Sequence, residues 1–217
     1  MVPRAPGYAM LVEFLEYPNE GYGSRPEECI RVLKDSEAGV ASTFAPFRDA
    51  AREMTTEQLQ ELYTRTFDIN PVCTLEVGWH VYGEDYARGA LLVKMKQQLR
   101  DHDLPESREL PDHLTHVLAL LARLQGEEAD GLASRYVLPA LGKMLGGMSD
   151  VDNPYKAVLE AIDQSVRSHF KVEIVAPRER RGDPPGWSSR MPVSPAGCGS
   201  RDNASLGRGR KGNHDVR

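Results

Sequence analysis

The sequence predicts an all-α protein, with a single helical-bundle domain over residues 1–172 and a disordered tail over residues 173–217. Apolar residues recur at helical spacing up to about Phe170. No run of alternating apolar and polar residues bounded by turns supports a sheet, and no repeat of a fixed period is present. After Val175 this periodicity stops and Pro, Gly, Ser and Arg predominate, which is typical of disorder.

Length and composition agree with one packed domain. The chain has 217 residues, of which 40% are hydrophobic and 27% are charged. This balance is typical of a soluble globular protein and excludes fibrous and wholly disordered chains. A chain of this length can bury a sizeable core, so we expect one domain and a tail.

Five helices are expected in the first half of the chain. Three short ones are expected over residues 8–16, 26–35 and 37–54. The fourth covers residues 55–67, where Thr55 and Gln58 have the spacing of a capping box. Its apolar face comprises Leu59, Leu62, Tyr63 and Phe67. The fifth covers residues 85–100 after the breaker Gly83, and its apolar face comprises Leu91, Leu92, Met95 and Leu99.

Three more helical segments are expected in the second half. One begins at Pro111, with Asp112 near the positive end of its dipole, and its apolar face comprises Leu114, Val117, Leu118, Leu121 and Leu124. Another covers residues 130–148 and should be kinked or divided by Pro139. The last opens with Asn153 as N-cap and Pro154 at the first helical position. Its apolar stripe comprises Tyr155, Val158, Leu159, Ile162, Val166 and Phe170.

Charge is divided unevenly along the chain and limits the classes of partner. The tail carries a net charge of +4, and residues 1–172 carry −9. An acidic body argues against nucleic acid as a partner and permits a basic peptide. The sequence has no apolar run long enough to cross a bilayer and no signal peptide, so we expect a cytoplasmic protein that does not insert into membranes. Three widely separated cysteines predict reduced thiols.

Residues 109–116 (Glu-Leu-Pro-Asp-His-Leu-Thr-His) are the stretch richest in functional polar groups. Asp112 with His116, or His113 with His116, could share a ligand on one helix face. A metal site is one interpretation, although no second cluster completes the three or four ligands that zinc requires. Alternatively, Asp112 caps amides and the histidines bond locally, or the stretch binds a peptide or another partner.

Residues 70–83 combine rigid turns with Glu76, Trp79, His80 and Tyr82. Tryptophan and tyrosine suit a groove that holds another chain's side chains, because each has a large apolar body and a polar group. They could equally belong to the core. No nucleotide-binding, phosphate-binding, nucleophile-elbow or zinc-protease motif is present, so no catalytic residue and no cofactor is predicted.

These two stretches resemble the TorD/NarJ family of molybdoenzyme assembly chaperones. The family's acidic-x-Pro-Asp-His signature is matched by residues 109–113. Within the family the chain is most similar to the nitrate reductase delta-subunit branch, over about residues 8–170. That likeness is carried by residues 15–18 (Leu-Glu-Tyr-Pro), 62–68 (Leu-Tyr-Thr-Arg-Thr-Phe-Asp), 75–80 (Leu-Glu-Val-Gly-Trp-His) and 86–90 (Tyr-Ala-Arg-Gly-Ala). The tail departs from the family.

The resemblance implies a TorD-like helical chaperone, not an enzyme, that acts in nitrate respiration. It would bind the N-terminal segment of the apo catalytic (alpha) subunit of nitrate reductase in the cytoplasm, until the molybdenum cofactor is inserted and the subunits join. By the same resemblance Glu109, Asp112 and His113 lie near the peptide groove, with Glu76 and Trp79 as further candidates. Two alternatives are a chaperone for another complex iron–sulfur molybdoenzyme, and a metal-dependent hydrolase that uses Asp112, His113 and His116.

Overall fold

Helices and helical turns make up the regular elements of the computed structural model, which describes residues 7–105, 107–148 and 152–171. Within these ranges no strand is present, and the one β-type pairing is an isolated bridge between Glu76 and His113. The predicted all-α fold is confirmed, and the predicted disordered tail lies outside the described residues. The helices are α1 (Gly7–Leu11), α2 (Arg25–Ser36), α3 (Ala38–Glu53), α4 (Thr56–Tyr63), α5 (Val77–Tyr82), α6 (Tyr86–Asp101), α7 (Leu114–Leu121), α8 (Gly126–Leu132), α9 (Leu138–Gly147) and α10 (Tyr155–His169).

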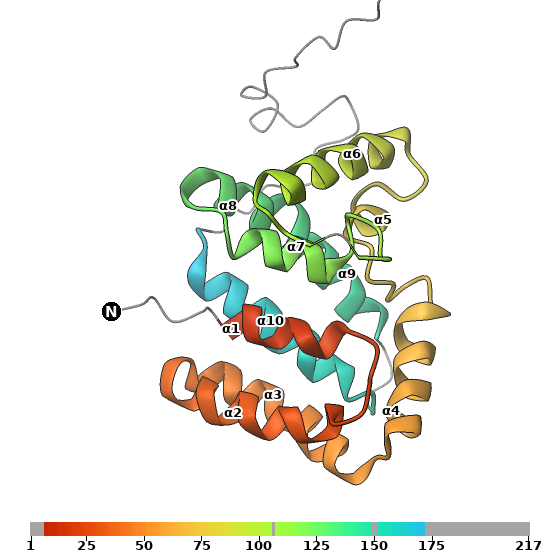
Figure 1. The fold of residues 1–217 in the computed structure, drawn as a ribbon, viewed down its shortest axis with the longest axis vertical. Coiled ribbons are helices and arrows are strands. Elements are labelled where there is room, and N and C mark those ends of the chain that lie inside the picture. The colour runs from red at the N-terminus through yellow and green to blue at the C-terminus, as the bar shows by residue number, and fades with distance from the viewer. Residues whose placement is uncertain (1–6, 106, 149–151, 172–217) are drawn as a thin grey trace, which may run out of the picture. The chain divides into compact units, whose positions relative to one another are not determined.

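Helix α10 is a central core element and packs against α1, α3 and α9 (Figure 1). It begins at Tyr155, one residue later than predicted, with Pro154 in the N-cap position, and the side chain of Asn153 accepts a 3.0 Å hydrogen bond from the Tyr155 N–H. The apolar stripe predicted from the sequence faces the interior, and five of its side chains have no exposed surface: Tyr155, Val158, Leu159, Ile162 and Val166.

Tyr155 connects this core helix to the segments that form the candidate site. Its ring lies 5.9 Å from that of Tyr63 and 4.9 Å from that of Phe67, measured between ring centroids. The Tyr63 hydroxyl in turn donates a 3.0 Å hydrogen bond to the Leu15 carbonyl. The end of α4 and the 3₁₀ turn after α1 (Val12–Leu15) are therefore fixed against the core.

The helix starts predicted at Thr55 and Asp85 are confirmed. Thr55 and Gln58 form the reciprocal capping box of α4. The Asp85 side chain accepts the Ala87 N–H at the start of α6, at 2.9 Å. After Tyr63 the α4 helix widens into a π-helical turn (Thr64–Asp68), which carries the buried side chain of Phe67.

Pro139 divides the helical segment around it, as predicted. A π-helical turn (Ala133–Val137) separates α8 from α9, and Pro139 occupies the first turn of α9. Proline lacks the N–H that an α-helix needs, and its ring collides with the preceding turn. A wide turn just before it removes that conflict.

Helix α7 begins at Leu114, three residues later than the predicted start at Pro111. The backbone there pairs with another segment instead of entering a helix. The Val77 N–H donates to the Asp112 carbonyl at 2.9 Å, and the Leu114 N–H donates to the Leu75 carbonyl at 2.8 Å. Asp112 therefore does not lie in the first turn of its own helix.

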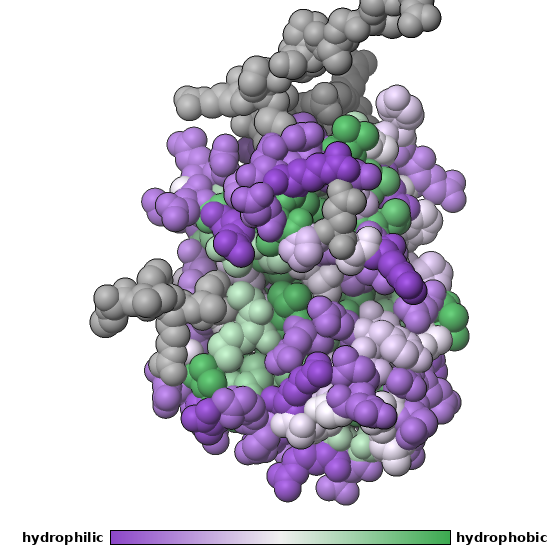
Figure 2. Space-filling view, in the orientation of Figure 1, coloured by the Kyte–Doolittle hydropathy of each residue, from purple (hydrophilic) through white to green (hydrophobic). Residues whose placement is uncertain are grey.

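The face of the described residues that Figure 2 shows is mostly hydrophilic. No helix of the described residues has both the length and the apolar character needed to cross a membrane. Among residues 7–105, 107–148 and 152–171, the large apolar side chains that are exposed are Tyr17, Ile69, Val72, Tyr86, Val93 and Leu110.

Candidate functional site

The two polar stretches singled out from the sequence lie side by side. Glu76 and His113 face each other in the antiparallel bridge, which joins the loop before α5 to the turn before α7. Residues directly opposite in such a pair project to the same face. A two-residue bridge thus brings a carboxylate and an imidazole together from distant parts of the chain.

Asp112 lies beneath this bridge and is fully buried. Its Oδ2 accepts a 3.0 Å hydrogen bond from the Gly78 N–H in the first turn of α5, and lies 3.7 Å from Nε of Arg88. The sequence predicted that Asp112 could cap amides, and it does so for α5 rather than for its own helix. Its carboxylate positions the site and is not exposed to a ligand.

Gly78 is required by this contact. A Cβ at this position would lie 2.6 Å from Oδ2 of Asp112 and 3.0 Å from a methyl group of Leu91. Any larger residue would push α5 away from the turn that carries Asp112.

Trp79 and Arg88 form a neighbouring pair on the outer side of α5. The indole Nε1–H donates a 3.0 Å hydrogen bond to the Pro71 carbonyl. The guanidinium carbon of Arg88 lies 5.7 Å from the centre of the indole ring, within range of a cation–π interaction. Arg88 is thus held between the indole and the buried carboxylate of Asp112.

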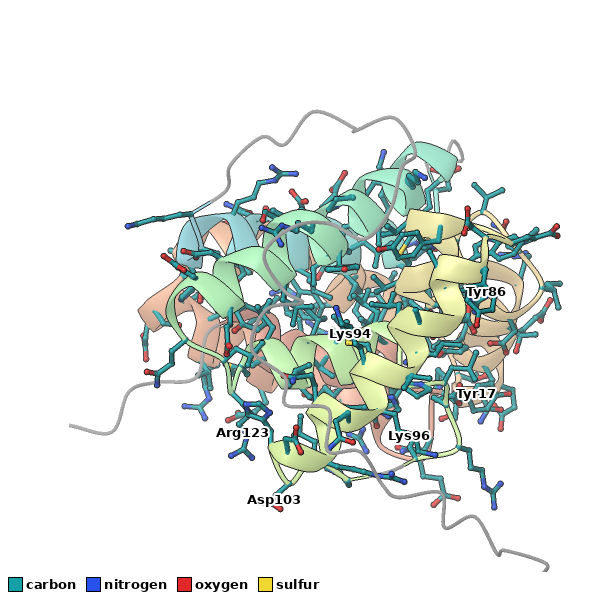
Figure 3. All side chains as sticks on the ribbon, turned by 90° about the horizontal axis from the view of Figure 1, so that it is seen from above. Tyr17, Tyr86, Lys94, Lys96, Asp103 and Arg123 are labelled. Atoms are coloured by element: carbon teal, nitrogen blue, oxygen red, sulfur yellow. The ribbon has the colours of Figure 1, made fainter. Side chains whose placement is uncertain are left out.

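A groove of about 700 Å³ opens beside the bridge. Its walls come from the 3₁₀ turn Val12–Leu15 and the residues after it, the end of α4 and the π-helical turn that follows, the 74–76 loop, residues 104–105 and 107–109, and α7. In Figure 2, hydrophobic side chains reach the surface between the regions of α1 and α7. Figure 3 labels Tyr17, an exposed aromatic side chain of the groove wall.

The groove has an apolar floor and an acidic rim. The floor comprises Val12, Leu15, Tyr63, Phe67, Leu75, Leu99, Leu104 and Ala119. Four carboxylates line the groove, from Glu16, Asp68, Glu76 and Glu109, against the single guanidinium of Arg108. Such a surface is complementary to a segment that has both apolar and basic side chains.

A smaller cavity of about 310 Å³ adjoins the groove and shares Asp68, Thr74 and Glu76 with it. Its other walls are Ile69, Pro71, Trp79 and Arg88. Of the residues predicted for the site, Glu109 and His113 line the groove, Trp79 lines the small cavity and Glu76 lines both. Asp112 lines neither cavity.

Burial changes the acid–base properties of the two bridge residues. It raises the pKa of the half-buried Glu76 carboxyl, and the nearby Asp112 carboxylate raises it further. Burial lowers the pKa of His113 to about 4, and the nearby His116 lowers it by a smaller amount. His113 is therefore neutral near pH 7, and the four carboxylates of the groove outnumber the guanidinium of Arg108.

Sequence comparisons identify the family of this fold and groove. Residues 33–168 match the family model described as "Nitrate reductase delta subunit". The chain belongs to this family. It is 30% identical over 190 residues to the "Nitrate reductase molybdenum cofactor assembly chaperone NarJ" of Escherichia coli strain K12, covering 81% of this chain and 77% of that protein. It is 24% identical over 157 residues to the "Probable nitrate reductase molybdenum cofactor assembly chaperone NarJ" of Bacillus subtilis, covering 71% of this chain and 85% of that protein.

Membership of the nitrate reductase delta subunit family confirms the resemblance recognised in the sequence motifs. Both relatives are named as assembly chaperones and neither as an enzyme. The geometry also does not bring the three ligands of the hydrolase alternative together around one point. Asp112 bonds to Gly78, His113 Nδ1 lies 2.7 Å from the Thr115 hydroxyl, and both ring nitrogens of His116 contact Ser107 and Leu110. No group of three potential metal ligands occurs among the described residues.

The groove also contains residues that the sequence analysis did not assign to the site. Leu15, Glu16 and Tyr17 line it, and so do Tyr63, Phe67 and Asp68. Both sets lie within motifs that this chain shares with the delta subunit family, so the signal was present in the sequence. Nothing in the periodicity showed that the two motifs meet in one groove.

Proposed function

We propose that this member of the delta subunit family is a cytoplasmic chaperone that binds the N-terminal segment of the apo catalytic (alpha) subunit of respiratory nitrate reductase. It holds that subunit while the molybdenum cofactor is inserted and the complex assembles. The names of its relatives support a chaperone of cofactor assembly. The groove supports a peptide segment as the part of the client that is recognised.

The observation that carries this proposal is the combination of an apolar floor with an acidic rim in a groove of about 700 Å³. A volume of this size takes several side chains, but not a folded domain. An amphipathic helix inserts side chains from one face into such a groove, at positions three, four and seven residues apart. The rim carboxylates attract a basic segment and set its register.

Release of the client is part of the function, so the affinity should be moderate. We expect a dissociation constant between roughly micromolar and tens of nanomolar, for a site with few deeply buried anchor residues. The binding partner in the test is a synthetic peptide of the N-terminal segment of the catalytic subunit encoded in the same genome. Isothermal titration of the full chain should give saturable binding with one site.

Filling the groove should abolish this binding. Ala119 is half-buried in the groove wall on α7, so Ala119→Trp places an indole where client side chains would insert. We expect the dissociation constant to rise by about tenfold or more, which corresponds to about 1.4 kcal/mol of binding free energy. Isothermal titration of wild type and variant with the same peptide measures the change.

Ala122→Trp is the matched control, because Ala122 is exposed just after α7 and does not line the groove. Both variants should retain the thermal unfolding midpoint of the wild type. Equal loss of binding in both variants, or full binding by Ala119→Trp, would place the peptide elsewhere. Absence of binding by the folded wild type would contradict the proposed function.

A further inference from the structure

The groove and the small cavity adjoin at a set of shared lining residues, which we call the waist. Asp68, Thr74 and Glu76 line both cavities, and no other residue does. Two of these three side chains are carboxylates. A segment that lies across both cavities must therefore pass a point of negative charge.

Glu76 is the more enclosed of the two waist carboxylates. It is half-buried, whereas Asp68 is exposed. Oε2 of Glu76 accepts a hydrogen bond from the Thr74 hydroxyl, which holds the carboxylate at the waist. Within the described part of the chain no cation forms an ion pair with it: the charge of the nearby Arg88 guanidinium partly offsets the rise in the pKa of the Glu76 carboxyl that burial causes, but Arg88 forms its ion pair with Asp112. A partly desolvated carboxylate of this kind gains most from a cation supplied by a ligand.

The cavities on the two sides of the waist differ in charge and size. The small cavity already contains a cation, because Arg88 is held there by Asp112 and by the face of Trp79. Its remaining walls include the apolar side chains of Ile69 and Pro71. The groove on the other side is more than twice as large and has the apolar floor described above. Beyond the two waist carboxylates, Arg88 is the one charged residue among the described ones that lines the small cavity, so this cavity attracts a second cation less than the groove does. The larger groove, with its apolar floor, suits bulky apolar side chains better.

We propose that Glu76 selects a client segment in which one lysine or arginine separates bulky apolar residues, which enter the groove, from an uncharged side chain, which enters the small cavity. This inference rests on the proposed function and specifies the chemistry of its client. On a helical segment, side chains three or four residues apart lie on one face. The apolar anchors should therefore lie three, four and seven residues to one side of the cation, and the uncharged side chain three or four residues to the other.

A double-mutant cycle tests the role of Glu76. Wild-type chain and Glu76→Gln are titrated with the N-terminal peptide of the catalytic subunit and with variants in which each lysine or arginine is replaced in turn by glutamine. Glu76→Gln should weaken binding of the parent peptide about tenfold. One of the glutamine-substituted peptides should bind wild type and Glu76→Gln with equal affinity. The tenfold effect of Glu76→Gln is then present only with the parent peptide, which corresponds to a coupling energy of about 1.4 kcal/mol between Glu76 and the replaced cation.

Two comparisons separate this role from other effects. Glu128→Gln removes an exposed carboxylate on α8 that lines neither cavity, and we expect it to weaken binding by no more than about twofold, because exposed charges away from the site are screened. The Glu76 side chain makes no capping bond to α5, so Glu76→Gln should unfold at the same temperature as the wild type.

The position of the cation provides the second measurement, with the wild-type protein. Moving the coupled lysine or arginine four residues towards the end that enters the small cavity brings it against Arg88. This peptide should bind about tenfold or more weakly than the parent. Moving it four residues the other way removes an apolar anchor and should also weaken binding.

The outcomes separate this inference from the proposed function. Peptide binding that is equal in wild type and Glu76→Gln, or that shows no coupling to any cation, would overturn the role of Glu76 and leave the chaperone function intact. Tight binding of the peptide with its cation shifted towards Arg88 would overturn the preference of the small cavity for an uncharged side chain. No binding of any peptide to the folded wild type would remove both proposals.

Discussion

Replacing Asp112 with alanine is expected to lower the free energy of unfolding by roughly 3–5 kcal/mol, the usual effect of removing one partner of a buried ion pair. The Asp112 side chain is fully buried, pairs with Arg88 and accepts the Gly78 N–H. Alanine leaves the guanidinium and the amide without these interactions and leaves a small cavity behind. Urea unfolding followed by circular dichroism measures the change in free energy.

Asp112→Asn is the informative comparison, because it keeps an oxygen that accepts the Gly78 N–H but removes the charge that faces Arg88. Burial raises the pKa of the Asp112 carboxyl, so the neutral amide should be tolerated better than alanine. We expect less than half of the loss seen with alanine. Glu109→Ala, which removes an exposed carboxylate, should change stability by no more than about 0.5 kcal/mol. A loss of similar size for Glu109→Ala and Asp112→Ala would contradict this assignment.

The stability of the protein should fall as the pH is lowered below the ordinary range of histidine, and His113 should be a main cause. Its pKa is about 4 in the folded protein, against an ordinary value of 6.5. Between these values the unfolded chain binds a proton that the folded protein does not, so acid favours unfolding. At about 1.4 kcal/mol per unit of pKa difference, the full effect is roughly 3 kcal/mol.

His113→Gln isolates this contribution. Urea unfolding midpoints of wild type and variant, measured between about pH 7 and pH 5, should converge as the pH falls, because only the wild type loses the contribution of His113. The pKa of His80 is also lowered by burial, but His80 is present in both proteins and its effect cancels. The raised pKa values of Glu76 and Asp112 act in the opposite direction, and these two groups are also present in both proteins. Parallel pH profiles for the two proteins would show that His113 is not protected from protonation.

Local signals in the sequence predicted most of the fold. The capping box at Thr55, the Asn153-Pro154 pair and the breaker Gly83 marked three helix starts to within one residue, because each signal depends on neighbours within a few residues. Pro139 marked the break between α8 and α9 for the same reason. The start of α7 was misplaced because residues 112–114 pair with a segment distant in the chain. Non-local backbone pairing leaves no mark on helical periodicity.

The candidate site was predictable in part for a related reason. Motif resemblance selected Glu76, Trp79, Glu109, Asp112 and His113, which all lie in or directly beneath the two cavities. Their roles could not be predicted, because these depend on burial. Asp112 and Glu109 both belong to the signature at residues 109–113, yet one is fully buried and the other is exposed. Only the first can hold the fold together, and only the second can meet a ligand directly.

Placement of Asp112 also decides how the function should be tested. A substitution there changes the position of α5 and the bridge, so lost binding could reflect lost folding. Side chains that line the groove and make few contacts with the core are better probes. Ala119 and Tyr17 meet this condition, because the first is half-buried and the second is 52% exposed.

The most direct test of the account is photo-crosslinking of the full chain to the apo catalytic subunit of nitrate reductase. A benzophenone amino acid replaces Tyr17 on the groove wall or, as a control, the exposed Arg123, which Figure 3 shows well apart from Tyr17. We predict that light links position 17, but not position 123, to the N-terminal segment of the catalytic subunit, as located by mass spectrometry. Crosslinks to that segment from position 123 alone, or from position 17 only to other parts of the subunit, would contradict the account.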